Sequence, residues 1–273
     1  MHLKDYQPKT VQQPRDAPEG FPNKSFLALL YSSKGTGKTN TLVNIVKEYA
    51  KHQFFQKVYL FSPSLHSDPK YNEMESKGIE LKTFDHYDDS LLKEVIEEIR
   101  ADLNEWREYQ RRKALYEKSK KVHNVSKLSE EDILDLWEMD WDEPPPCRFT
   151  KEPWSLIIFD DLASHPQLMK QGKSVASSFL LLHRHLLVSV AFCTQIFRSS
   201  VPKMVRNNLD WYILGKSKSE ENMESVASEL DSYISKKEII EKWEKATQEP
   251  FSYFCINLMN PKHRFTKNFD EPL

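Results

Sequence analysis

Short apolar runs alternate along the chain with longer segments that are apolar on one side only. The first run, Phe26–Tyr31, leads into a turn rich in Ser and Gly, and the turn opens a segment with apolar residues at i, i+3, i+4 and i+7. That spacing is typical of one face of a helix. Further short runs predict strands at 57–63, 79–84, 154–162, 188–195 and 211–214. The alternation of strands with helices predicts an α/β fold.

A long helical section interrupts this alternation. Ser90–Lys121 is predicted as one helix, apolar on one face as far as Trp106 and strongly charged beyond it. The charged half is interpreted either as a solvated helix with i,i+4 ion pairs or as a surface that contacts DNA. A second helix is expected after Ser129, which can cap it, and the run Pro144–Pro146 ends the section. We therefore predict a helical insertion at about 100–152.

The two ends of the chain have patterns of their own. Residues 1–25 contain four prolines among polar residues and predict an extended arm, either a disordered tail or a segment that packs on a neighbouring subunit. Two Ser-x-x-Glu sequences, at Ser217 and Ser235, predict the starts of two helices, and a last strand is expected at 251–258. The predicted organisation is thus an arm at 1–25 and one domain at 26–273, with a helical C-terminal section.

Composition narrows the class of protein. With 273 residues, 39% of them hydrophobic, the chain can bury the core of one large domain. The net charge of −2 gives no global basic field, so any contact with nucleic acid must come from local clusters. Three distant cysteines fit a reducing compartment. No apolar stretch approaches the roughly 20 residues that span a bilayer, and no signal peptide is visible, so we expect a soluble intracellular protein.

The turn after Tyr31 has the composition of a phosphate-binding P-loop, and an ordinary Ser/Gly-rich turn is the alternative. Gly35 and Gly37 let the backbone curl until its N–H groups point at phosphate oxygens, and the following helix N-terminus adds partial positive charge. Lys38 can reach the β- and γ-phosphates, and the Thr39 hydroxyl can ligate Mg²⁺. The pattern expects glycine at position 32, where Ser32 fits if its φ is negative. The predicted nucleotide-binding residues are Ser33, Lys34, Gly35, Thr36, Gly37, Lys38, Thr39 and Asn40.

Two carboxylates end the strand predicted at 154–162, in the pattern of a Walker B motif. Asp160 is predicted to hold Mg²⁺ through water, and Asp161 to act as the base that orients the attacking water. Gln195 ends the next strand, and its amide is interpreted either as a sensor of the γ-phosphate or as a plain strand-end residue. With Lys38 these residues form the predicted catalytic set, and the expected cofactors are ATP and Mg²⁺. His183, His185 and Cys193 fit no zinc spacing.

The order of these motifs resembles a known family. A P-loop, a strand ending in Asp-Asp, Arg184-His185, a strand ending in Gln195 and Arg206-Asn207 are similar to the genome-packaging ATPases of poxviruses, giant viruses, virophages and related large DNA transposons. These ATPases form a branch of the FtsK/HerA superfamily of DNA-pumping motors. The resemblance covers about residues 25–215.

The resemblance implies a fold, an assembly and a location. The sheet should be mostly parallel and of the ASCE type of P-loop NTPases, with the strand ending in Gln195 between the P-loop and Walker B strands. The subunits should form a homo-oligomeric ring, a pentamer or hexamer, around double-stranded DNA, with ATP between neighbours. An arginine acting in trans is expected, with Arg184 first, then Arg206 and Arg198. Capsid or portal-vertex proteins are the implied partners, and the host-cell cytoplasm (virus factory) and the virion the implied locations.

Three functions are weighed on this basis. The leading hypothesis is an ATP-hydrolysing DNA translocase that packages a double-stranded DNA viral genome into a preformed capsid. Its DNA contacts should be to phosphates, with Lys203, Arg206 or the inserted helix as candidates. A nucleoside or small-molecule kinase on the same loop, which needs clustered arginines at an acceptor site, is one alternative. A nucleotide-switched oligomeric scaffold without turnover is the other.

Overall fold

The computed structural model describes residues 12–75, 78–121, 128–162, 165–169, 174–197 and 201–273. These residues divide into two compact units, the first within Met1–Lys93 and Trp154–Leu273 and the second within Glu94–Pro153. None of the helices in the described ranges combines the length and the apolar composition needed to cross a membrane.

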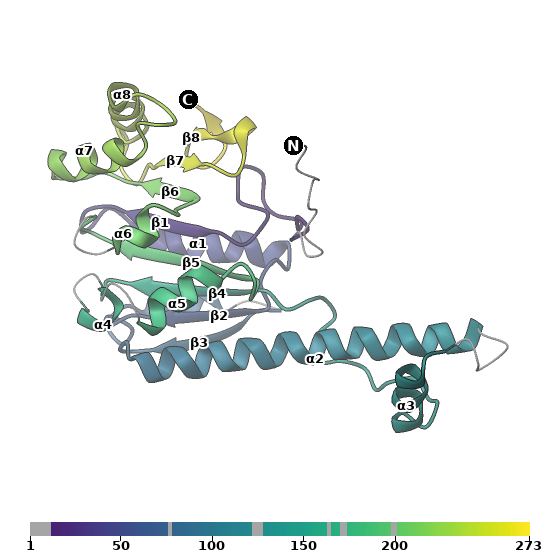
Figure 1. Ribbon diagram of the computed structural model, residues 1–273. Helices are drawn as coiled ribbons and strands as arrows, with labels where there is room; N and C mark the ends of the chain where they lie inside the picture. Colours follow the sequence, from purple (N-terminus) through teal and green to yellow (C-terminus); the bar gives the residue numbers. More distant parts are fainter. Residues whose placement is uncertain (1–11, 76–77, 122–127, 163–164, 170–173, 198–200) are drawn as a thin grey trace, which may run out of the picture. The chain divides into compact units, whose positions relative to one another are not determined.

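A single sheet forms the centre of the first unit (Figure 1). Its strand order is β3-β2-β4-β5-β1-β6-β7-β8-β9, and the pairs from β3 to β6 are parallel while those from β6 to β9 are antiparallel. The strands are β1 Leu27–Tyr31, β2 Lys57–Phe61, β3 Glu80–Phe84, β4 Ser155–Asp160, β5 Val188–Thr194, β6 Trp211–Leu214, β7 Phe254–Asn257, β8 Phe265–Lys267 and β9 Glu271–Pro272. The expected mostly parallel α/β sheet is confirmed, and β5, which precedes Gln195, lies between β1 and β4 as predicted.

The central strands are apolar because both of their faces are covered. Every residue of β1, β2, β4 and β5 is buried, and strands of that kind have near-continuous apolar sequences instead of alternating ones. The edge strand β3 is half exposed and carries charged residues. Since the central strands are parallel, their carboxyl ends meet at one edge of the sheet, where α/β folds bind their ligands.

Helices cover both faces of the sheet, with α1 and α5 on opposite faces (Figure 1). The elements are α1 Lys38–Lys51, η1 Pro69–Met74, α4 Pro166–Met169, α5 Val175–Leu182, α6 Lys203–Arg206, α7 Glu220–Glu229, α8 Lys236–Ala246 and η3 Pro261–His263. The apolar stripe predicted for α1 is buried, and its last member, Tyr49, packs against the rings of Phe26 and Trp211. This packing fixes the start of α1, and with it the P-loop, at the carboxyl end of β1.

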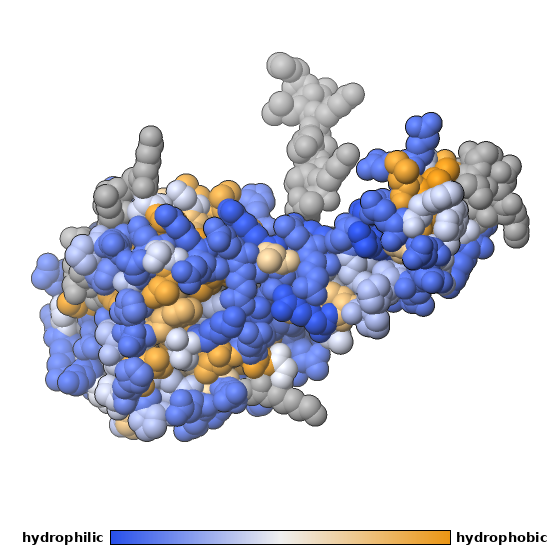
Figure 2. All heavy atoms as spheres, turned by 90° about the horizontal axis from the view of Figure 1, so that it is seen from below, coloured by the Kyte–Doolittle hydropathy of each residue, from blue (hydrophilic) through white to orange (hydrophobic). Residues whose placement is uncertain are grey.

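The second unit consists of most of α2 Asp89–Lys121, together with α3 Glu130–Glu138. Ser129 caps α3 as predicted, accepting a hydrogen bond from Asp132 N at 3.1 Å. In Figure 2 this unit is mostly hydrophilic, with apolar side chains gathered over α3. Four cations in the charged half of α2, Arg111, Arg112, Lys118 and Lys120, pair with acids, for example Arg111 with Glu108 at 2.8 Å. These pairs favour the solvated-helix interpretation over the DNA-contacting one.

At three places the structure differs from the sequence predictions or adds to them. Ser219 caps α7, not Ser217, because Ser219 accepts from Asn222 N while Ser217 bonds to Ser219 itself. The C-terminal residues after β7 form two short strands, β8 and β9, for which the sequence made no prediction. Residues 12–25 pack on their own unit through Phe21, whose ring lies 5.0 Å from Trp211, and through Arg15. The rest of the expected arm, 1–11, lies outside the described residues.

Candidate functional site

The loop between β1 and α1 has the backbone geometry that phosphate binding requires. Gly35 and Gly37 have φ of +82° and +85°, in the left-handed region that glycine enters without steric cost. Gly37 is the N-cap of α1 and has no side chain to occupy the N–H groups of the first turn. Those N–H groups and the positive end of α1 are therefore available to an anion.

Ser32 takes the place of the expected glycine, and the structure shows how. The φ of Ser32 is not positive, so a residue with a side chain fits there without backbone strain. Its side chain is fully buried. Gly215 lies opposite, and a Cβ at that position would be 2.8 Å from the Ser32 Cβ. The missing side chain of Gly215 thus makes room for the extra side chain of Ser32.

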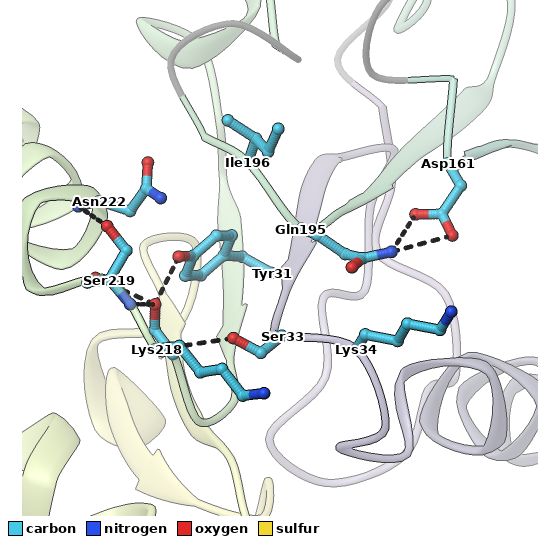
Figure 3. Close-up of a pocket in the computed structure, with 10 residues that line it drawn as sticks. Tyr31, Ser33, Lys34, Asp161, Gln195, Ile196, Lys218, Ser219 and Asn222 are labelled. Atoms are coloured by element: carbon cyan, nitrogen blue, oxygen red, sulfur yellow. Dashed lines mark hydrogen bonds between the residues drawn. The ribbon is translucent and has the colours of Figure 1, made fainter.

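Two segments distant in sequence hold the loop in shape. Ser33 N donates to Lys216 O at 3.0 Å, and Lys218 N donates to Ser33 Oγ at 2.9 Å (Figure 3). Tyr253 donates its hydroxyl to the carbonyl oxygen of Thr36 at 3.0 Å. Sequence reasoning missed this support, because nothing in residues 215–218 or in Tyr253 signals a contact with a loop more than 180 residues earlier.

Lys38 and the two aspartates form one charged cluster. The Lys38 Nζ donates to Asp161 and lies 3.8 Å from the Asp160 Oδ1. Lys38 is nearly buried and the Asp160 side chain is 2% exposed, whereas that of Asp161 is 34% exposed. Asp161 follows β4 directly with φ of +49°, a left-handed conformation that turns the chain sharply and separates the two side chains. The structure therefore brings the predicted Lys38, Asp160 and Asp161 together.

Asp160 is held by residues that the sequence did not indicate. Tyr71 donates its hydroxyl to the Asp160 Oδ2, and Ser62 Oγ lies 3.4 Å from the same atom. Burial raises the pKa of Asp160, and the nearby Asp161 raises it further, whereas Lys38 and the hydrogen bond from Tyr71 lower it. Ser62 and Tyr71 follow β2, the neighbour of β4, so the fold places them here, but a lone tyrosine in a loop carries no signal of this role.

Gln195 completes the group from the end of β5. Its Nε2 lies 3.4 and 3.5 Å from the two carboxylate oxygens of Asp161, long hydrogen bonds that Figure 3 shows beside a cavity of about 560 Å³. Ser33, Lys34, Asp161 and Gln195 line this cavity and also a second one, of about 390 Å³, which extends over the P-loop to Thr39 and Asn40. The two cavities meet at the ends of β4 and β5.

A resident metal centre is not evident from the described side chains. No group of three or more His, Cys, Asp or Glu residues there is arranged to hold an ion. The Asp160 Oδ1, however, is buried and accepts no hydrogen bond from a described residue. An acceptor of that kind, together with the Thr39 hydroxyl in the cavity, fits Mg²⁺, which typically takes one or two carboxylates and completes its shell with phosphates and water.

The arginines predicted to act in trans lie away from this cluster. Arg184 precedes β5 and pairs at 2.7 Å with Asp210, which accepts from Leu27 N at the start of β1, so it lies at the opposite edge of the sheet from the P-loop of its own chain. Arg206 is nearly buried and pairs with Glu229 at 3.0 Å. Arg198 lies outside the described residues. A role in a neighbouring subunit remains a prediction for all three.

The buried histidine of this region has a structural role. His183 Nδ1 lies 2.7 Å from the carbonyl oxygen of Val188, at the turn into β5. Burial lowers the pKa of His183 to about 4, so its ring is neutral near pH 7. A neutral Nδ1–H donating to the carbonyl holds the chain as it enters the strand.

Comparison with known proteins identifies the fold. No protein-family model matches the chain, and neither does any curated protein sequence. Among solved structures, the DNA-packaging ATPase B204 of Sulfolobus turreted icosahedral virus matches over 92% of this chain and 99% of its own, with a TM-score of 0.55 and 11% identity. The genome packaging NTPase B204 of Sulfolobus turreted icosahedral virus 2, in complex with ATP-gammaS, matches over 89% and 96%, with a TM-score of 0.51 and 10% identity. The resemblance read from the sequence is thereby confirmed at the level of the fold: the chain has the P-loop ATPase fold of these genome-packaging enzymes.

Proposed function

We propose that the chain is an ATP-hydrolysing motor that moves double-stranded DNA, and specifically one that packages a viral genome into a preformed capsid. One observation carries the proposal of hydrolysis. Asp160 and Asp161 come from the end of β4, Gln195 from the end of β5 and Lys38 from the P-loop that follows β1. They converge at the edge of the sheet where the loop leaves N–H groups open to phosphate.

Each member of the cluster has a chemical role in hydrolysis. The triphosphate replaces Asp161 as the partner of Lys38, which then offsets charge on the β- and γ-phosphates. Asp161, no longer paired, accepts a proton from the water that attacks the γ-phosphorus, and Gln195 orients that water by hydrogen bonding. The bond from the γ-phosphorus to the bridging oxygen breaks, and ADP and phosphate leave. Mg²⁺, held by Thr39 and by Asp160 through water, supplies further charge neutralisation when bound.

The proposal of a ring is supported by the absence of an arginine among the described residues of the site. Phosphoryl transfer is commonly assisted by an arginine, and the described walls of both cavities contain lysines but no arginine. Arg184 cannot serve its own site, since it lies at the other edge of the sheet. Its side chain is 55% exposed, so it is accessible to an adjacent subunit, and we assign it to the site of that neighbour in a homo-oligomeric ring.

The proposed DNA substrate, the capsid partners and the location rest on similarity of fold. Arg206 is nearly buried and paired, so Lys203, which is exposed, is the better candidate for a phosphate contact. Capsid or portal-vertex proteins are the proposed further partners, and the virus factory of the host cytoplasm and the virion the proposed locations. The kinase alternative gains no support from the cavities, because the described lining residues include no arginine cluster for an acceptor phosphate.

The test is the steady-state ATPase rate of the wild type and of Lys38→Ala, with and without double-stranded DNA, at two salt concentrations. We expect DNA to stimulate hydrolysis, the stimulation to fade at high salt because phosphate contacts weaken with salt, and the variant to be inactive. An ATPase rate that DNA does not change would contradict the proposal of a DNA-translocating motor. Nucleotide binding without turnover would favour the scaffold.

A further inference from the structure

An exposed aromatic ring lies against the P-loop from a distant part of the chain. Phe251, between α8 and β7, lines the cavity that extends over Thr39 and Asn40, and its side chain is 67% exposed. A Cβ built on Gly37 would lie 2.9 Å from the Phe251 Cδ1, so the ring rests directly on the glycine backbone. Gly37 therefore has two reasons to be glycine, its positive φ and this close approach.

The backbone holds this ring in place. Phe251 has φ of +63°, a left-handed conformation that a phenylalanine adopts only when its surroundings impose it. The segment is anchored on both sides: Trp243 Nε1 donates to Gly215 O at 3.0 Å, and Tyr253 donates to Thr36 O at 3.0 Å. A strained residue that presents an apolar ring to water beside an anion-binding loop gains nothing for the folded chain alone, and it points to a ligand.

The position of the ring within the cavity indicates which part of a ligand it meets. Ser33, Lys34, Asp161 and Gln195 line both cavities, whereas Thr39, Asn40 and Phe251 line the one over α1 and not the other. That cavity thus extends from the Asp161–Gln195 end, where the terminal phosphate belongs, towards the first turn of α1 and Phe251. A nucleotide bound with its γ-phosphate at Asp161 has its base at the far end of its phosphates, on the side of the ring.

The other cavity offers no comparable surface for a base. The one aromatic side chain among its described lining residues is Tyr31, which is 1% exposed and whose hydroxyl is hydrogen-bonded to Ser217 Oγ at 2.6 Å. A flat base needs an accessible ring face or a flat apolar wall to stack on. Of the described aromatic residues that line these two cavities, Phe251 alone presents such a face.

We propose that Phe251 is the platform on which the nucleobase stacks, so that the chain binds a nucleoside triphosphate by its base as well as by its phosphates. This inference rests on the nucleotide site of the proposed function and adds a base-binding residue to it. Base–aromatic stacking contributes roughly 1–3 kcal/mol, which corresponds to about 5- to 150-fold in the dissociation constant. Because every base has a π face, stacking alone discriminates weakly between bases.

The experiment compares ATP with inorganic triphosphate, which has no base. Dissociation constants are measured by calorimetry for wild type, Phe251→Ala, Phe251→Trp and Lys38→Ala, with thermal unfolding as a check on folding. Alanine keeps a Cβ in the same left-handed conformation, so only the ring is removed. Tyr233→Ala is the matched control, since Tyr233 is 52% exposed and is not among the residues that line either cavity.

We expect Phe251→Ala to weaken ATP by about 5- to 150-fold and to leave triphosphate unchanged, while Phe251→Trp and Tyr233→Ala keep both affinities. Lys38→Ala should weaken both ligands. Equal losses of affinity for ATP and triphosphate in Phe251→Ala would overturn the inference, because the ring would then only shape the P-loop. Unchanged affinity for both ligands would overturn it as well. A wild type that binds neither ligand would overturn the nucleotide site itself and the base platform with it.

Discussion

The hydrogen bond from Tyr71 to Asp160 gives the sharpest test of the electrostatics of this site. Asp160 is an aspartate buried behind the P-loop lysine, and burial raises its pKa. Burial and the neighbouring Asp160 also raise the pKa of Tyr71, so its hydroxyl stays protonated and donates. Replacing Tyr71 with Phe removes this donor, together with two longer and neutral hydrogen bonds of the same hydroxyl, to Ser62 Oγ at 3.3 Å and to Ser64 Oγ at 3.2 Å.

The magnitude follows from the charge of the acceptor. A hydrogen bond to a charged group contributes about 1.5–3 kcal/mol, against about 0.5–1.5 kcal/mol for a neutral pair. Ser62 Oγ, at 3.4 Å from the same oxygen, is too far to replace the hydroxyl fully. We therefore expect Tyr71→Phe to lower the free energy of unfolding by about 1.5–3 kcal/mol at pH 8 without nucleotide. At a pH below the raised pKa of Asp160 the carboxyl is neutral, and the loss should shrink to that of a neutral pair.

The assay is urea unfolding of wild type and Tyr71→Phe at pH 8 and at acid pH. The m-value should be the same for both proteins, so that the difference reports stability alone. Tyr49→Phe is the matched control, because Tyr49 is equally buried and donates at 3.0 Å to a neutral acceptor, the carbonyl oxygen of Pro22. The reasoning is refuted if Tyr71→Phe at pH 8 costs no more than Tyr49→Phe, since Asp160 would then not be a charged acceptor.

Three further predictions test other parts of the site. Asp160→Asn should abolish hydrolysis yet raise the free energy of unfolding without nucleotide at pH 8, because a carboxyl whose pKa is raised on folding makes stability fall as pH rises through that pKa. The gain, measured by urea unfolding, should vanish at acid pH, and a loss of stability at pH 8 would contradict the prediction. Arg184→Ala should cost less than about 1 kcal/mol of stability, because its ion pair is exposed, but should lose ATPase activity that mixing with inactive Lys38→Ala subunits restores. If the mixture of the two variants shows no ATPase activity, Arg184 does not act in trans. Gly215→Ala places a Cβ 2.7 Å from Tyr253 and 2.8 Å from Ser32, so overpacking should cost about 1–3 kcal/mol and weaken ATP binding. Adding Ser32→Gly should recover part of both, and no recovery would mean that the two residues do not compete for the same space.

The strands and the P-loop were predictable because their signals are local. Apolar runs marked the central strands, and Gly35, Gly37 and Lys38 marked the loop wherever the rest of the chain packs. Local signals failed where two patterns compete within a few residues. Ser217 and Ser219 both precede the start of α7, and only the folded loop shows which one caps it. The short strands β8 and β9 could not be predicted because their pairing partners, not their own sequences, make them strands.

The candidate site was predictable only for residues whose role has a signal in the local sequence. Asp160 and Asp161 end an apolar run and could be found, whereas Tyr71, Gly215 and Phe251 act through contacts across the sheet that no spacing records. The role of Ser32 is the clearest case, since a departure from the motif is accommodated by a glycine far along the chain. The trans arginine depends on a second subunit, which the geometry of one chain does not supply.

The most direct test of hydrolysis at this cluster separates binding from chemistry in one variant. Phosphate release from saturating Mg²⁺-ATP is measured for wild type and Asp161→Asn, with ATP affinity determined on the same samples. If Asp161 is the base, the variant should bind ATP at least as tightly as wild type, because Lys38 loses a competing carboxylate, and its turnover should fall by about 10²- to 10⁴-fold. Turnover at the wild-type rate with unchanged binding would contradict the assignment of this cluster as the hydrolytic site.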